Sequence, residues 1–194
     1  MYKLVELSSG ICSANGFYAS GVWAGLRPNG ADDMAFIYSD SACEIASVFT
    51  TNKMCAAPIR HFLKMGEFQT NFVLINAKNA NAMTGSAGIE DIDEVLAYLK
   101  AKYPQVQNPV MSSTGVIGVR MPKEKLKNGI DLFDLTKQEG DRAARAIMTT
   151  DTFSKQMAFR VELANGKSFS IGGMAKGAGM INPAMATMLC FITT

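Results

Sequence analysis

A glycine- and alanine-rich segment near the end of the sequence carries some of the few groups that could do chemistry. It spans 172–190 (GGMAKGAGMINPAMATMLC) and holds a single lysine, Lys176, and a single threonine, Thr187. Small side chains allow a ligand or another chain segment to approach the backbone closely. A tight loop that leads into a buried strand explains this composition equally well. The Gly-x-Gly-x-x-Asn spacing at 177–182 is only an imperfect dinucleotide fingerprint, and the sequence has no P-loop pattern.

Three other polar segments could also line a site. Residues 111–118 (MSSTGVIG) set hydroxyl side chains beside glycines. A hydroxyl and a backbone N–H side by side are what an oxyanion hole requires, although such a run is more often a turn between strands. Hydroxyls cluster again at 147–152 (IMTTDT) and asparagines at 76–82 (NAKNANA). For the last two segments, closing a turn or fixing a loop is the more frequent role.

The composition excludes several other kinds of site. His61 is the only histidine, which rules out a multi-histidine zinc site and leaves any Ser-His-Asp triad dependent on one residue. The net charge of +2 over 194 residues gives no electrostatic footprint for nucleic acid. The cysteines (Cys12, Cys43, Cys55 and Cys190) lack C-x-x-C spacing and indicate free, mostly buried thiols. With neither a signal peptide nor a membrane span in the pattern, we expect a cytoplasmic protein.

Strand patterns supply part of the framework for these segments. Short apolar runs predict strands at 34–38, 47–51 and 72–75. A hairpin is expected around a three-residue loop at 164–166, with its glycine left-handed. That loop length sets Val161 opposite Phe169 and Phe159 opposite Ile171, which keeps the apolar side chains on one face.

Helical patterns supply the rest. Ile92, Val95, Leu96 and Leu99 share one helical face, which predicts a helix over 89–102. Its first turn is acidic and its last turn basic, in agreement with the helix dipole, and Pro104 follows it. A second helix is expected over 137–148, with Ala143, Ala144 and Ile147 facing inward. The whole chain is therefore predicted to be mixed α/β, with more than one layer of sheet.

Ten short motifs, taken in order along nearly the whole chain, resemble one enzyme family. They are Gly16-Phe17, Gly21-Val22, Ser39-Asp40, 48–52 (VFTTN), 56–58 (AAP), 79–85 (NANAMTG), 113–118 (STGVIG), 149–152 (TTDT), 176–180 (KGAGM) and 186–189 (ATML). No single motif is specific, but the ordered set resembles the ornithine acetyltransferase (bifunctional glutamate N-acetyltransferase) family of arginine biosynthesis. The resemblance implies a layered α/β/β/α sandwich of the self-processing, N-terminal-nucleophile-like kind.

The resemblance also implies that a precursor cleaves itself at the Ala186–Thr187 bond. Residues 1–186 would then form an α-chain domain, and 187–194 would be the start of a β chain that continues beyond this sequence. The freed Thr187 would be the nucleophile, with its own α-amino group as the base, since such an amine titrates near neutral pH. The implied assembly is an α2β2 heterotetramer with the β chain of the same precursor.

Site residues carry over by position. Thr114, through its hydroxyl, and Gly115, through its backbone N–H, would form the oxyanion hole, where one donor is typically worth ~3 kcal/mol. Thr150, Lys176 and Thr187 match substrate-binding positions, and Lys176 suits a substrate carboxylate. The implied reaction moves an acetyl group from N2-acetylornithine through Thr187 to glutamate. It needs no metal or cofactor, although some family members also accept acetyl-CoA as a substrate.

Two alternatives stay open at this point. One keeps the nucleophile but uses water as the acceptor, as in an aminopeptidase or amidase of the related self-cleaving fold. The other is a non-catalytic scaffold subunit of the α-chain type. The sequence also departs from the family pattern at Lys78, where glycine is usual, and at Ser154, where proline is usual. Both departures concern loop shape rather than the expected chemistry.

Overall fold

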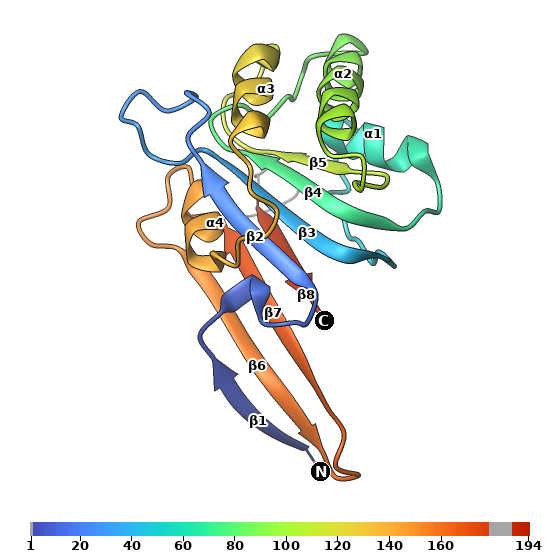
Figure 1. The fold of residues 1–194 in the computed structure, drawn as a ribbon. Helices are drawn as coiled ribbons and strands as arrows, with labels where there is room; N and C mark the ends of the chain where they lie inside the picture. Colours follow the sequence, from blue (N-terminus) through green and yellow to red (C-terminus); the bar gives the residue numbers. More distant parts are fainter. Residues whose placement is uncertain (1, 179–187) are drawn as a thin grey trace.

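Two four-stranded sheets form the framework of the computed structural model, which describes residues 2–178 and 188–194 (Figure 1). The strands are β1 (Tyr2–Leu7), β2 (Phe17–Val22), β3 (Met34–Cys43), β4 (Thr70–Asn76), β5 (Val110–Ser113), β6 (Lys155–Leu163), β7 (Ser168–Lys176) and β8 (Leu189–Thr193). The first sheet has the order β2-β3-β4-β5 and the second β1-β6-β7-β8. Neighbouring strands are antiparallel except β4 and β5, which are parallel. The expected mixed α/β fold with more than one sheet layer is confirmed.

Helices cover one face of the first sheet. The helical segments are α1 (Ala57–Met65), α2 (Ala87–Lys102), α3 (Lys123–Asp131), α4 (Gly140–Ala146) and the 3-10 helix η1 (Gly10–Cys12). Helices α1, α2 and α3 lie on the face of the first sheet that points away from the second (Figure 1). Ile92, Val95, Leu96 and Leu99 of α2 are all buried in this core, as their spacing predicts.

A second core lies between the two sheets. Alternate residues of β3 serve the two cores: Phe36 faces the helices, and Ile37 faces the second sheet. Helix α4 packs in this second core against β2, so closely that a Cβ on Gly21 would lie 2.8 Å from the Cβ of Ala146. The outer face of the second sheet is not covered by any helix among the described residues.

Helix α4 is shorter than the sequence predicts. Ala143, Ala144 and Ile147 are fully buried, as expected, but the helix begins at Gly140 rather than at residue 137. Residues 137–139 pair with β2 instead: the Ala19 amide donates to the Lys137 carbonyl at 3.0 Å, and the Glu139 amide donates to the Ala19 carbonyl at 2.7 Å. Backbone groups used in this bridge cannot join the helix.

The predicted hairpin is confirmed in its loop and its register. Val161 pairs with Phe169 and Phe159 with Ile171, while Gly166 adopts a left-handed φ of +79°. Together with β1, the hairpin extends beyond the body of the molecule as an arm (Figure 1).

Two other expectations are wrong. Residues 47–51 form no strand in the described structure, and Val48 is almost fully exposed. The four cysteines are free, as expected, but only Cys12 is buried and Cys190 is exposed. Among the described residues, no helix is both long and apolar enough to cross a membrane.

Candidate active site

Four segments of the chain meet at one cavity of about 240 Å³. One segment follows β4, the second follows β5, the third follows α4, and the fourth is the end of β7. The residues that line the cavity are Lys78, Thr114, Gly115, Val116, Thr149, Thr150, Lys176 and Ala178. The structure therefore brings together four of the residues expected from the sequence: Thr114, Gly115, Thr150 and Lys176. The other two, Ala186 and Thr187, lie outside the described residues.

Lys176 is a buried cation at the centre of this group. Its side chain is only 4% exposed. The Nζ atom donates to Thr149 Oγ1 at 2.7 Å and to Thr114 Oγ1 at 3.2 Å, and lies 3.9 Å from Asp151 Oδ2. Burial lowers the pKa of Lys176, and the charge of Asp151 opposes that shift. The ammonium group is thus engaged by groups of the protein itself.

Asp151 was not singled out from the sequence, yet it organises the site. Its side chain is fully buried, and Oδ1 accepts hydrogen bonds from Lys155 Nζ and the Gly177 amide, both at 2.7 Å. Oδ2 accepts from the Thr149 amide at 3.2 Å. Burial alone would raise the pKa of Asp151, but these hydrogen bonds and the charge of Lys176 lower it to about 2. The available signal was its position as the only ionisable side chain in the hydroxyl cluster at 149–152.

Thr114 and Gly115 place two potential donors side by side. Since the Thr114 hydroxyl oxygen accepts from Lys176, its hydrogen can be donated to another acceptor in the cavity. Gly115 has a φ of +138°, and a Cβ there would lie 2.2 Å from the carbonyl carbon of Lys78. Only glycine fits this position. The Gly115 amide makes no hydrogen bond within the described part of the chain.

The asparagine-rich segment has a structural role, in agreement with the more frequent interpretation. Asn76 accepts from the Ser113 hydroxyl at 2.7 Å and donates to the Asn79 carbonyl at 2.9 Å. Asn79 Oδ1 accepts from the Asn81 amide, and the Asn81 side chain donates to the Gly88 carbonyl at 2.8 Å. This network fixes the loop that packs against the residues following β5.

The only histidine of the sequence is not part of this cavity. His61 lies on α1, where its Nε2 is 3.1 Å from Asp93 Oδ1 of α2. The contact joins two helices of the outer layer. The arrangement at the cavity therefore offers hydroxyls, an amide and a buried ion pair, without an imidazole base.

Comparisons with known proteins identify similar chains. A sequence model of the ArgJ family matches residues 18–194. The chain is 58% identical to the arginine biosynthesis bifunctional protein ArgJ of Wolinella succinogenes, covering 100% of this chain and 49% of that protein. It is 44% identical to the ArgJ protein of Dehalococcoides mccartyi, covering 95% of this chain and 46% of that protein. The chain thus spans about half the length of the curated relatives it matches.

Two crystal structures are also similar. The arginine biosynthesis bifunctional protein argJ from Bacillus halodurans matches with a TM-score of 0.86 and 31% identity. Ornithine acetyltransferase from Mycobacterium tuberculosis, complexed with ornithine, matches with a TM-score of 0.75 and 33% identity. In both cases the match covers 97% of this chain and 100% of the matched chain. These matches confirm the expected fold.

Proposed function

The chain belongs to the ArgJ family, and we propose that it is the amino-terminal half of a self-processing acetyltransferase of arginine biosynthesis. The proposed reaction transfers the acetyl group of N2-acetylornithine to glutamate. The observation that carries this proposal is the convergence of Thr114, Gly115 and Lys176 on one cavity. Thr114 and Gly115 follow β5 of the first sheet, whereas Lys176 ends β7 of the second sheet, more than 60 residues later.

In the proposed mechanism, Thr187 Oγ attacks the acetyl carbonyl carbon while its proton passes to the α-amino group of Thr187. The carbonyl oxygen becomes negatively charged and accepts hydrogen bonds from the Thr114 hydroxyl and the Gly115 amide, which stabilise that charge. The C–N bond then breaks, and ornithine leaves with the proton. The amine of glutamate attacks the resulting acetyl-threonine ester and releases Thr187. The hydrogen bond from Lys176 to the Thr114 hydroxyl oxygen supports this role, because the hydroxyl hydrogen can then be donated to the oxyanion.

Lys176 and Thr150 are proposed to contact substrate as well. Lys176 lines the cavity with a positive charge that suits a substrate carboxylate, and the Thr114 and Thr149 hydroxyls fix the position of its ammonium group. Thr150 lines the cavity and is exposed, so its hydroxyl is open to a substrate group. Acetyl-CoA stays a further candidate donor.

Residues before and after the Ala186–Thr187 bond support cleavage there. Ala178 lines the cavity, and Leu189 pairs with Lys176 in the second sheet. The comparisons add support: the matched chains of the two crystal structures are covered completely, whereas the curated relatives are about twice as long. A precursor as long as the curated relatives, cut near its middle, would give chains as short as those in the crystal structures.

The proposed partner is the β chain of the same precursor, in an α2β2 assembly. Support comes from the outer face of the second sheet, which presents a row of exposed apolar side chains: Tyr2, Leu4, Met157, Phe169 and Ile192. Such a face marks a surface for another chain. Four free cysteines favour a reducing compartment, the cytoplasm.

The test is expression of the full-length polypeptide, followed by intact-mass measurement, N-terminal sequencing and an acetyl-transfer assay. We expect a fragment that begins with Thr187 and transfer that depends on glutamate. Thr187→Ala should abolish cleavage and transfer together. An uncut chain with full activity would overturn the mechanism, and acetylornithine hydrolysis unaffected by glutamate would favour the amidase alternative.

A further inference from the structure

We propose that Lys78 determines specificity for the anionic acetyl acceptor, by binding one of its carboxylates at the mouth of the cavity. This inference rests on the proposed acetyl transfer and assigns a role to a residue that the resemblance does not supply. Its occupant is the dicarboxylate acceptor rather than the donor.

The backbone at Lys78 is held in a conformation that disfavours a side chain. Its φ is +70°, in the left-handed region where glycine is the least strained residue. The surroundings impose this conformation: the Lys78 carbonyl accepts from the Val116 amide at 3.1 Å, and Asn76 holds the next residue through the Asn79 carbonyl. A Cβ on Gly115 would come within 2.5 Å of the Lys78 Cα, so the two backbones are tightly packed. A lysine held in this conformation points to a use for its side chain.

Lys78 and Lys176 carry the same charge but lie in different environments. Both line the cavity, but Lys176 is buried against Thr149 and Asp151. Lys78 is exposed and makes no ion pair with any described residue. Of the two cations, Lys78 is therefore the one placed to meet a charged group that arrives from solvent.

The proposed substrates differ in charge at this point. N2-acetylornithine carries one carboxylate and one ammonium group, whereas glutamate carries two carboxylates and must present its amine uncharged to attack the ester. An exposed cation at the cavity attracts the second substrate more strongly than the first. Because the site is exposed, salt should screen the attraction.

The experiment uses the full-length enzyme with Lys78→Gln, Lys78→Gly and Lys78→Arg. Lys78→Gln removes the charge but keeps a side chain in the left-handed conformation, while Lys78→Gly removes both. We expect the KM for glutamate to rise by roughly three- to tenfold at low salt in both variants, and the rise to shrink at high salt. Lys78→Arg should keep the KM near that of the unchanged enzyme. Lys78→Gly should also raise the melting temperature by about 2–4 °C, because it relieves the backbone.

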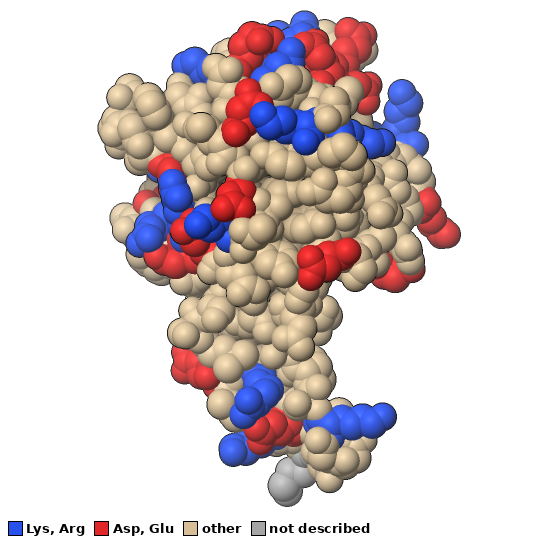
Figure 2. All heavy atoms as spheres, viewed as in Figure 1, with Lys and Arg blue, Asp and Glu red and all other residues tan. Residues whose placement is uncertain are grey.

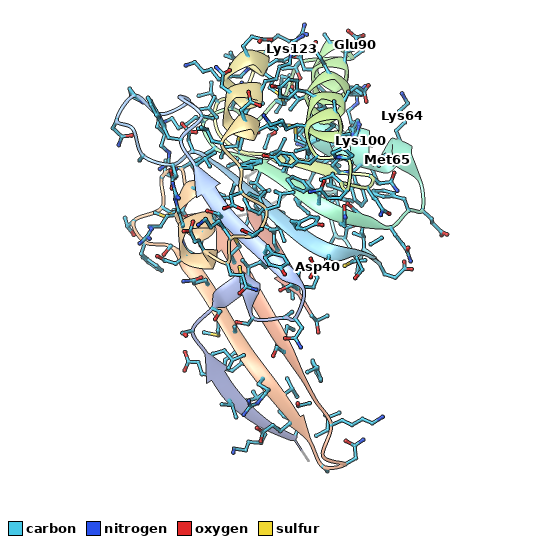
Figure 3. The ribbon with its side chains drawn as sticks, viewed as in Figure 1. Asp40, Lys64, Met65, Glu90, Lys100 and Lys123 are labelled. Carbon is cyan, nitrogen blue, oxygen red and sulfur yellow. The ribbon has the colours of Figure 1, made fainter. Side chains whose placement is uncertain are left out.

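The matched control is Lys64→Gln. Lys64 is an exposed lysine that projects outward from α1, and its loss changes the net charge equally (Figure 3). The proposal is overturned if Lys78→Gln leaves the glutamate KM unchanged, if the KM for N2-acetylornithine rises as much, or if Lys64→Gln has the same effect. Each of these results leaves glutamate-dependent transfer by the unchanged enzyme intact, whereas absence of that transfer would overturn the proposed function itself.

Discussion

Among the individual residues, Asp151 makes the hydrogen bonds and the ion pair that hold the polar groups of the candidate site together. It accepts from Lys155 and from two backbone amides, and it faces the buried Lys176. Asp151→Asn keeps the shape but places an amide nitrogen against donors and leaves Lys176 without its counter-charge. We expect a loss of about 3 kcal/mol in the free energy of unfolding, measured in urea at pH 7. A loss below 1 kcal/mol would show that the ion pair is not needed to hold these segments.

The same carboxylate predicts a pH dependence. Its pKa is about 2 in the folded protein, well below the ordinary range of an aspartate side chain. A lowered pKa contributes stability that is fully present above about pH 4 and is lost as the pH falls towards 2. By linkage this amounts to about 2 kcal/mol. Urea unfolding between pH 2 and 6 should show this loss in the unchanged protein, with a shallower slope for Asp151→Asn; identical slopes would contradict it.

Thr114 gives the sharpest test of the oxyanion hole. Thr114→Val removes the hydroxyl without changing the shape much, and should lower kcat by about 100-fold with little change in KM. Thr114→Ser retains the hydroxyl and should stay within a few fold of the unchanged enzyme. Both are measured in the full-length enzyme under saturating glutamate. Equal activity of the valine and serine variants would exclude Thr114 from transition-state stabilisation.

The sequence predicts some residues of the candidate site but not the contacts between them. Thr114, Gly115, Thr150 and Lys176 could be named because the motifs around them resemble those of the ornithine acetyltransferase family. The ion-pair partner of Lys176 could not be predicted, because Asp151 approaches Lys176 only after α4 and β7 have packed together. The strain at Lys78 likewise depends on the backbone of another segment.

At the element scale, the end of α4 positions residues 149–151. Arg27 donates to the carbonyls of Ala146 and Met148, at 3.3 and 2.5 Å, and so caps the last turn of this short helix. Arg27→Ala should destabilise the protein by about 1–3 kcal/mol and lower transfer activity, because the loop after α4 loses its anchor. Thermal unfolding and kcat are the measurements.

The control for this variant lies on the same helix. Arg145 is exposed and forms an ion pair with Asp141, one turn earlier, so Arg145→Ala should cost less than about 0.5 kcal/mol. If both arginine variants behave alike, capping by Arg27 does not position the site.

The elements also show where periodicity suffices. α2 and the β6–β7 hairpin are determined by local spacing and turn length, so their positions and register could be predicted. The start of α4 could not, because it depends on the bridge from residues 137–139 to β2. Residues 47–51 show the converse: their apolar pattern is typical of a strand, but no strand of the described structure pairs with them.

At the scale of the whole molecule, the pairing of distant strands is what local patterns leave open. β1 pairs with β6, so the start of the chain joins a strand more than 140 residues later, and Tyr2 pairs with Leu163. The arm that results carries mixed charges at its tip, and the face shown between tip and body is largely uncharged (Figure 2). The cavity forms only when both sheets are in place, so no single motif specifies it by itself.

The uncovered face of the second sheet yields the last prediction. Phe169 and Ile192 are 46% and 66% exposed on that face, so replacing both by serine should change the stability of this chain alone only slightly. If the β chain or a second copy covers the face, the double variant should weaken assembly of the processed enzyme.

Sedimentation velocity across a concentration series measures that assembly. The control is Leu132→Ser at the end of α3, where the side chain is 61% exposed on the helical layer instead. We expect the double variant to dissociate at concentrations at least tenfold higher than the unchanged enzyme, since burial of two large side chains contributes roughly 2–4 kcal/mol to association. Leu132→Ser should assemble normally. Normal assembly of the double variant would mean that the apolar face stays open to solvent in the working enzyme, and that the oligomer is built on another surface.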